Sequence, residues 1–231
     1  MGLASSLASV ILAGATMMNT AFDTAKPNMD IEGTIFLVNR QYRITDAYIP
    51  EVRRANVTGS VREMRDDAAA ALEEMFAACK EETGATLITV SGYRSYQTQK
   101  TIYNRKVQNT GSRAKADEYV AWPGASEHQL GMAMDVNQKN RTDGLTASFA
   151  RTKGGKWMAE NCHRFGFILR YQEGWEDITG YKYESWHVRY VGLEHSVAMA
   201  EADIPMETYM DDYLADTLIT ILESDASYLV E

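Results

Sequence analysis

The chain has 231 residues, of which 45% are hydrophobic, a composition typical of a globular protein with one sizeable core or at most two small ones. Its 32 acidic and 23 basic side chains give a formal charge of -9, which excludes the basic footprint of a nucleic-acid-binding protein. No stretch reaches the roughly 18 apolar residues that a membrane-spanning helix needs. We therefore expect one globular domain without a nucleic-acid partner.

The first 27 residues differ in character from the rest of the chain. Residues 3–18 are mainly small and apolar, and Ala13-Gly14-Ala15 has the small-x-small form of a signal cleavage site, yet no Lys or Arg precedes it. The remnant of an export signal or anchor and an ordinary N-terminal helix both remain open. We divide the chain into an N-terminal segment, 1–27, and one domain, 28–231, with a helical C-terminal tail.

Apolar runs and helical spacing predict the first elements of this domain. Residues 34–38 form a short apolar run typical of a strand. A helix is expected over 61–82, because Ser60 can cap it, apolar residues recur at helical spacing and Gly84 supplies a stop. The β-branched residues of 86–90 predict a buried strand.

The remaining elements follow in mixed order. They are a helix over 96–107 capped by Ser95, a loop over 108–127, a strand over 131–136, a helix over 156–164, strands over 167–170 and 186–191, and a helical tail from Glu194. Helices and strands do not alternate regularly. This order favours an α+β fold, with a small antiparallel sheet flanked by helices, over a doubly wound parallel sheet.

Two cysteines and two of the histidines are expected to have no chemical role. Cys79 and Cys162 lie far apart and in no C-x-x-C pair, which excludes a zinc ribbon or a dense disulfide framework. We expect two buried thiols, with one disulfide as the alternative. His163 and His195 are expected to be ordinary surface or core residues.

The other two histidines lie near carboxylates in a pattern that suits a metal. His128 is followed seven residues later by Asp135, on the polar side of the predicted strand, and His187 follows Glu184 by three residues. Two imidazoles and one carboxylate leave the fourth position of a tetrahedral zinc ion open, as a hydrolytic site requires. Glu184 could then act as general base. Spacing alone is only moderately specific, since both patterns occur by chance.

Four motifs in order make this prediction far more specific. They are 91–96 (SGYRSY) with Gln99, 124–136 (GASEHQLGMAMDV), 165–171 (FGFILRY) and 184–192 (ESWHVRYVG). Together they resemble the successive signatures of the VanY-type D-alanyl-D-alanine carboxypeptidase family. The resemblance covers roughly residues 34–210.

This resemblance implies a fold, a metal site and a base. The fold is a small α+β domain with zinc in an open cleft on the antiparallel sheet. The zinc ligands are His128, Asp135 and His187, and the base is Glu184. The implied enzyme is a zinc peptidase that removes the terminal D-alanine of peptidoglycan stem peptides.

The resemblance also implies the substrate contacts. Arg94 should hold the terminal carboxylate of the peptide or the developing oxyanion, and a salt bridge that fixes the loop is the alternative role. Gln99 and Ser126 match positions that contact the substrate, whereas Trp186 is expected to pack beside the metal. The implied location is extracytoplasmic, in the bacterial cell envelope, with membrane association only through the N-terminal segment.

Other activities remain open on the same site. An L,D-carboxypeptidase acting on tetrapeptide stems and a peptidoglycan endopeptidase are alternatives, because stereochemical preference depends on the shape of the pocket around the scissile bond. A non-catalytic zinc or cell-wall binding module is disfavoured, since a binder has no need for Glu184. No oligomeric state follows from the sequence.

Overall fold

A four-stranded antiparallel sheet lies at the centre of the computed structural model, which describes residues 33–212. Its strands are β3 (Leu87–Ser91), β4 (Ala133–Gln138), β6 (His187–Tyr190) and β5 (Phe167–Leu169), in the order β3-β4-β6-β5. A separate two-stranded ribbon pairs β1 (Arg53–Arg54) with β2 (Glu63–Met64). The predicted α+β fold with a small antiparallel sheet is confirmed.

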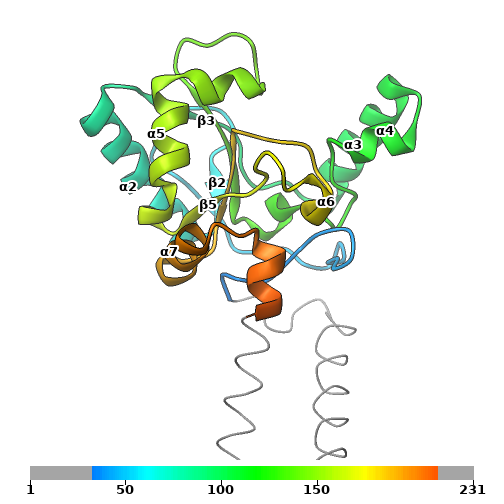
Figure 1. Cartoon of the computed structure of the whole chain (residues 1–231). Helices are drawn as coiled ribbons and strands as arrows, with labels where there is room; N and C mark the ends of the chain where they lie inside the picture. Colours follow the sequence, from blue (N-terminus) through cyan, green and yellow to red (C-terminus); the bar gives the residue numbers. More distant parts are fainter. Residues whose placement is uncertain (1–32, 213–231) are drawn as a thin grey trace, which may run out of the picture.

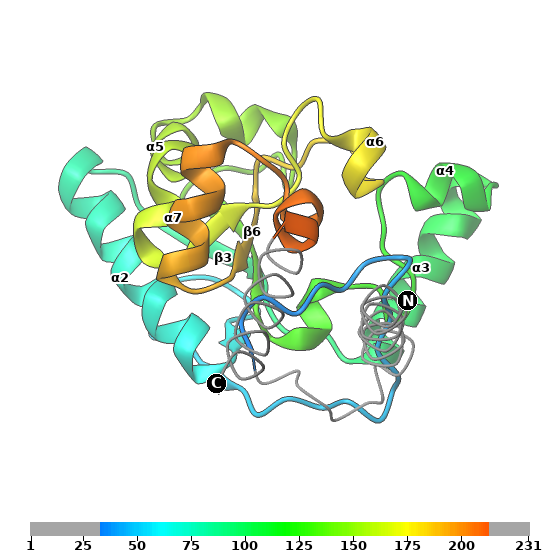
Figure 2. The ribbon, with the colours of Figure 1, turned by 60° about the horizontal axis from the view of Figure 1, so that its bottom comes forward.

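Helices flank this sheet on two sides of the molecule. They are α2 (Asp66–Thr83), α3 (Tyr96–Thr110), α4 (Arg113–Asp117), α5 (Lys153–Asn161), α6 (Glu176–Thr179) and α7 (Leu193–Ala202), with short 3-10 helices at Glu127–Leu130, Ala147–Arg151 and Cys162–Phe165. Helices α2, α5 and α7 gather on one side, whereas α3 and α4 project from the other (Figures 1 and 2). The sheet lies between these two groups.

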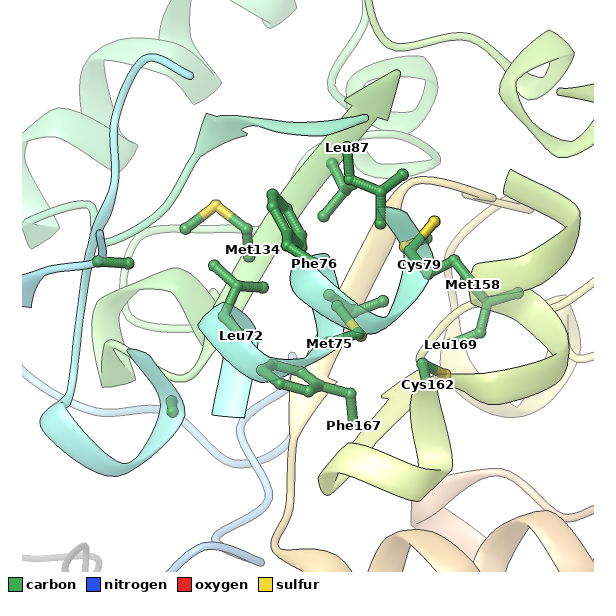
Figure 3. Close-up of a cluster of buried hydrophobic side chains, with 14 of the residues drawn as sticks. Leu72, Met75, Phe76, Cys79, Leu87, Met134, Met158, Cys162, Phe167 and Leu169 are labelled. Carbon is green, nitrogen blue, oxygen red and sulfur yellow. The ribbon is translucent and has the colours of Figure 1, made fainter. Parts of the chain in front are cut away.

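The main hydrophobic core fills the space between the sheet and helices α2 and α5 (Figure 3). Leu72 and Met75 of α2 are fully buried there against Met134 and Val136 of β4. Burial of each such side chain contributes about 1.5–3 kcal/mol. Because side chains alternate along a strand, Asp135 points away from this core, toward the opposite face of the sheet.

Helix α2 starts later than the sequence predicts. The predicted helix over 61–82 is wrong at its first residues, because Glu63 and Met64 pair with β1 instead. Ser60 does not cap the helix, since its hydroxyl donates to the carbonyl oxygen of Val90. The predicted stop is confirmed: Gly84 has a φ of 75° and its N–H donates to Lys80.

The strand predicted over 34–38 is also wrong. This segment has no regular structure, and the carbonyl oxygens of Thr34 and Phe36 accept hydrogen bonds from the Arg189 guanidinium instead of from a strand. Leu37 and Val38 are nevertheless buried, so the apolar run indicated burial correctly.

The other elements lie near their predicted positions. Helix α3 is capped as expected, with Ser95 Oγ accepting from the N–H of Thr98. The predicted loop over 108–127 is wrong in part, because it contains α4, capped by Ser112. Helix α5 starts three residues before the predicted 156, where Thr152 caps it. The tail is helical in α7 and again from residue 206 to 212, after Pro205.

Two further predictions concern the cysteines and the chain ends. Cys79 and Cys162 are buried free thiols, as expected. The N-terminal segment 1–27 and tail residues 213–231 lie outside the described residues. Within 33–212, no helix combines the length and the apolar character needed to cross a membrane.

Candidate active site

Three elements bring the predicted metal ligands together. His128 lies in the 3-10 helix Glu127–Leu130, Asp135 lies in β4, and His187 lies directly opposite Asp135 in β6. All three are buried, and one donor atom from each lies within 4.8 Å of the others. Two imidazoles and a carboxylate at this separation are the donor set of an open zinc site.

Hydrogen bonds select the ring nitrogen that each histidine offers to an ion. His128 Nδ1 lies 2.7 Å from the carbonyl oxygen of Gly92, so we assign the ring proton there and leave Nε2 free. His187 Nε2 lies 3.2 Å from Glu127 Oε2, which leaves Nδ1 facing Asp135 Oδ1 at 3.0 Å. His128 Nε2 and His187 Nδ1 therefore both face the Asp135 carboxylate, and the three residues fit a bound zinc ion.

Glu127 contacts the predicted ligand His187, and the sequence motifs gave it no role. Its side chain is completely buried, and Oε1 accepts hydrogen bonds from Arg170 Nε at 2.8 Å and Arg189 Nη1 at 3.1 Å. Burial alone would raise the pKa of Glu127, but the charges of the two arginines outweigh it and hold the pKa well below its usual value. Glu127 is thus an anion that orients His187.

The Glu127 cluster extends to the C-terminal helical segment. Glu207 accepts from both terminal nitrogens of Arg170, at 2.9 and 2.6 Å. This bidentate pair fixes the guanidinium that in turn contacts Glu127. The position of Glu127 beside a ligand in sequence is the one signal that could have indicated its role.

The electrostatics of the ligand cluster favour a cation. Burial, and next the charge of Arg94, lower the pKa of His128 to about 4, so this imidazole is neutral and able to bind metal. Burial would lower the pKa of His187 as well, but its bonds to Asp135 and Glu127 outweigh burial and raise this pKa to about 9. Without a bound ion, His187 is therefore an imidazolium with a proton on each nitrogen at neutral pH, and an ion bound at Nδ1 would replace the proton there.

Arg94 lies against the same cluster. Its Nη2 donates to Asp135 Oδ2 at 2.6 Å and lies 3.0 Å from His128 Nε2, so the guanidinium contacts two of the three predicted ligands. Ser91 accepts from Nε at 2.8 Å and Gln99 Oε1 from Nη1 at 3.3 Å. The structure thus contains the salt bridge that the sequence reasoning gave as the alternative role of Arg94.

Glu184 lies at the edge of the ligand cluster. Its Oε2 is 3.9 Å from His187 Nδ1, and its side chain is 18% exposed. Burial raises the pKa of Glu184 to about 7, although His187 acts in the opposite direction. A carboxylate with this pKa can both accept and return a proton near neutral pH.

One cleft of about 450 Å³ contains every residue predicted for the site. Its lining includes Arg94, Gln99, Ser126, His128, Asp135, Glu184 and His187. Trp186 lines the cleft and packs against the main core, as predicted. His163 and His195 do not line the cleft, and His195 Nδ1 lies 2.8 Å from the Tyr209 hydroxyl.

The fold and the cleft define a metal-dependent peptide hydrolase, and comparison with known proteins gives its family. The family model described as VanY, D-alanyl-D-alanine carboxypeptidase, matches residues 61–193. The chain belongs to this family and is a carboxypeptidase.

Curated relatives agree with this assignment. The putative carboxypeptidase YodJ of Bacillus subtilis is 42% identical over 187 residues, which cover 78% of this chain and 68% of YodJ. A D-alanyl-D-alanine carboxypeptidase of Enterococcus faecalis is 33% identical over 201 residues, covering 84% of this chain and 71% of that protein.

Solved structures share the fold. The LD-carboxypeptidase LdcB is 42% identical with a TM-score of 0.71, covering 76% of this chain and 84% of LdcB. VanYB in complex with D-alanine-D-alanine is 32% identical with a TM-score of 0.66, covering 77% of this chain and 97% of VanYB. A VanY D,D-pentapeptidase mutant in complex with Zn(II) has the same identity and TM-score and covers 77% of this chain and 98% of its own.

Proposed function

We propose that this carboxypeptidase uses one zinc ion to remove the terminal D-alanine from peptidoglycan stem peptides in the bacterial cell envelope. The observation that carries the proposal is the convergence of His128, Asp135 and His187 with Glu184 in one cleft. The VanYB complex with D-alanine-D-alanine supports the substrate, and the Zn(II) complex of a VanY relative supports the metal.

The ligand atoms follow from the hydrogen bonds of the histidines. His128 Nε2, the Asp135 carboxylate and His187 Nδ1 would hold the ion. Zinc supplies a Lewis acid and lowers the pKa of water toward about 7. Glu127 keeps the His187 ring in the tautomer that this arrangement needs.

Glu184 is the proposed proton carrier. With its pKa near 7, the carboxylate takes a proton from the attacking water as the C–O bond forms. It returns this proton to the peptide nitrogen as the C–N bond breaks, so that D-alanine leaves as a neutral amine. A position at the edge of the cluster, 3.9 Å from His187 Nδ1, suits this role.

Arg94 is the proposed anchor for the substrate anion. A zinc ion bound to Asp135 would neutralise the carboxylate that Arg94 now contacts. The planar guanidinium of Arg94 would then be available to a substrate carboxylate or an oxyanion. Gln99 Oε1 accepts a hydrogen bond from the Arg94 guanidinium. The amide nitrogen of Gln99 donates to the carbonyl oxygen of Ala121 at 2.8 Å, which holds the Gln99 side chain in place. Ser126, which also lines the cleft, is a proposed substrate contact.

A second candidate activity has one specific observation in its favour. LdcB, whose TM-score is 0.71 and identity 42%, is described as an LD-carboxypeptidase. Incubation with a stem pentapeptide and a stem tetrapeptide, followed by mass measurement of the products, distinguishes the two activities. We expect release of D-alanine from the pentapeptide. Cleavage of the tetrapeptide alone would establish the L,D activity instead.

We also propose a division of the chain. Residues 28–231 form the catalytic domain, and 1–27 serve as an export signal or anchor, through which any membrane association would occur. Fractionation of cells that express the full chain and the chain from residue 28 onward tests this division. The full chain should reach the envelope, and the shortened chain should stay in the cytoplasm while keeping its activity.

A further inference from the structure

A second groove lies beside the active-site cleft. It has a volume of about 370 Å³ and contains three cationic and three aromatic side chains: Arg43, Lys100, Arg113, Tyr96, Tyr103 and Trp122. We refer to these six residues as the α3 groove. None of them belongs to the proposed catalytic machinery.

The α3 groove and the cleft share helix α3 as a wall. Gln99, Ile102 and Lys106 of α3 line the cleft, whereas Tyr96, Lys100 and Tyr103 line the groove. At about 100° per residue, these two sets lie roughly 90° apart around the helix axis. A long substrate could therefore contact both surfaces at once.

The cations of the α3 groove are available to a ligand. Arg43, Lys100 and Arg113 are exposed, and within residues 33–212 no side-chain hydrogen bond or ion pair engages them. The guanidinium of Arg43 lies 5.8 Å from the centre of the Trp122 ring, so cation and aromatic surface are neighbours.

Among the described residues, Asp117 is the one carboxylate that lines the groove, and its hydrogen-bond partners also line the groove. Asp117 Oδ1 accepts from the Tyr103 hydroxyl and from Trp122 Nε1, each at 2.8 Å. These bonds hold the two aromatic side chains in place. Asp117 therefore shapes the aromatic surface, and three cations with one carboxylate leave the groove a net charge of +2.

The local charge is opposite to that of the whole chain. Residues 84–116 contain no Asp or Glu, but they contain the basic residues Arg94, Lys100, Arg105, Lys106, Arg113 and Lys115. The chain as a whole has a formal charge of -9. Five of these six basic residues, all except Arg94, lie on the projecting helices α3 and α4, and this positive region is suited to an anionic polymer (Figure 1).

We propose that the α3 groove binds a second part of the peptidoglycan polymer. The apolar face of a sugar ring packs on the aromatic side chains, and a stem-peptide carboxylate lies between the cations. This inference rests on the proposed function, because it takes the substrate to be a stem on such a polymer. Two linked contacts increase the effective concentration of stems at the cleft.

The test compares two triple variants with equal loss of charge. In the groove variant, Arg43, Lys100 and Arg113 become alanine; in the control, the exposed residues Lys139, Arg151 and Lys156 become alanine. Binding is measured by sedimentation with insoluble peptidoglycan from which hydrofluoric acid has removed phosphodiester polymers. Turnover of a free stem pentapeptide is measured in parallel.

The groove variant should bind the treated peptidoglycan at least roughly tenfold more weakly than wild type, while the control binds normally. Both variants should hydrolyse the free pentapeptide at the wild-type rate. Equal binding by the two variants would overturn the proposal. Loss of wild-type binding after the acid treatment would also overturn it, since the ligand would then be a phosphodiester polymer.

Failure of the groove proposal and failure of the proposed activity give different results in this test. If the wild-type protein cleaves no stem peptide, the proposed function fails, whereas the binding difference between the two variants is still measured. If wild type cleaves the pentapeptide and the groove variant binds normally, the groove proposal alone fails.

Discussion

His187 Nε2 lies 3.2 Å from Oε2 of Glu127, so a completely buried carboxylate stands directly behind a proposed metal ligand. The other oxygen of Glu127 contacts Arg170 and Arg189, which are themselves buried. The orientation of the ligand therefore depends on an ionic cluster inside the protein, and this dependence can be measured.

Glu127→Gln should destabilise the protein strongly. The substitution removes the negative charge that two buried guanidinium groups face, and loss of one partner of a buried pair costs about 3–5 kcal/mol. Zinc affinity should also fall by roughly 10- to 100-fold, because His187 loses its orienting anion. Urea unfolding and competition with a chelator measure the two effects.

Glu82→Gln provides the matched control for this substitution. Glu82 pairs with Arg164 at 2.8 Å, but the side chain of Glu82 is 39% exposed and that of Arg164 is 44% exposed. Loss of such a surface pair should change the free energy of unfolding far less than Glu127→Gln does, and it should leave zinc affinity unchanged. Equal effects of the two substitutions would contradict the role assigned to Glu127.

The stability of the metal-free protein should fall in acid. The pKa of Glu127 is lower in the folded state than in the unfolded chain, where it is about 4.3, so the unfolded state binds more protons below that pH. The stabilisation is complete above this pH and is lost as the pH falls toward the lower folded pKa. Unfolding free energies measured from pH 6 to pH 3 should therefore decrease, with a smaller slope in Glu127→Gln.

Neither cysteine should react in the native protein. Cys79 and Cys162 are buried, and burial raises the pKa of Cys162 to about 12, so almost no thiolate exists at neutral pH. An aromatic disulfide reagent should titrate no thiol in the folded protein and both thiols in denaturant. Rapid modification of either thiol before unfolding would contradict this prediction.

Arg94→Lys should impair recognition of the free carboxyl end. Lysine keeps the positive charge but lacks the planar fork that now contacts Ser91, Gln99 and Asp135. The loss of charged hydrogen bonds predicts a decrease in kcat/KM on the order of 10- to 100-fold. Amidation of the substrate's C-terminus should impair the wild-type enzyme similarly. Equal cleavage of amidated and free peptides would indicate an endopeptidase.

The sequence predicted the residues of the site, but it did not predict the buried ion pairs that orient them. The ligands, Glu184 and Arg94 belong to short motifs, and all of them line the cleft. The ion pairs of Glu127 with Arg170 and Arg189 join residues 43 and 62 positions apart, and no local spacing reveals such a contact. Tertiary contacts of this kind are set by the pairing of strands and not by sequence periodicity.

The same reason explains the errors in the fold. The apolar run 34–38 satisfies strand propensity. Its carbonyl oxygens, however, accept hydrogen bonds from the side chain of Arg189, which is 155 residues from Thr34 and 153 from Phe36. Helix α2 starts at Asp66 because Glu63 and Met64 pair with β1, a contact that helical spacing does not register. Local signals such as the Ser95 cap were predicted correctly.

The most direct test of the account is the turnover and zinc content of Glu184→Gln. The amide keeps the size of the side chain but accepts no proton, and the three proposed ligands are unchanged. A positioned general base contributes about 10²–10⁴-fold, so kcat on a stem pentapeptide should fall by at least that range while zinc stays near one equivalent per chain. Near wild-type turnover would place the base elsewhere, and loss of the metal would make Glu184 a ligand.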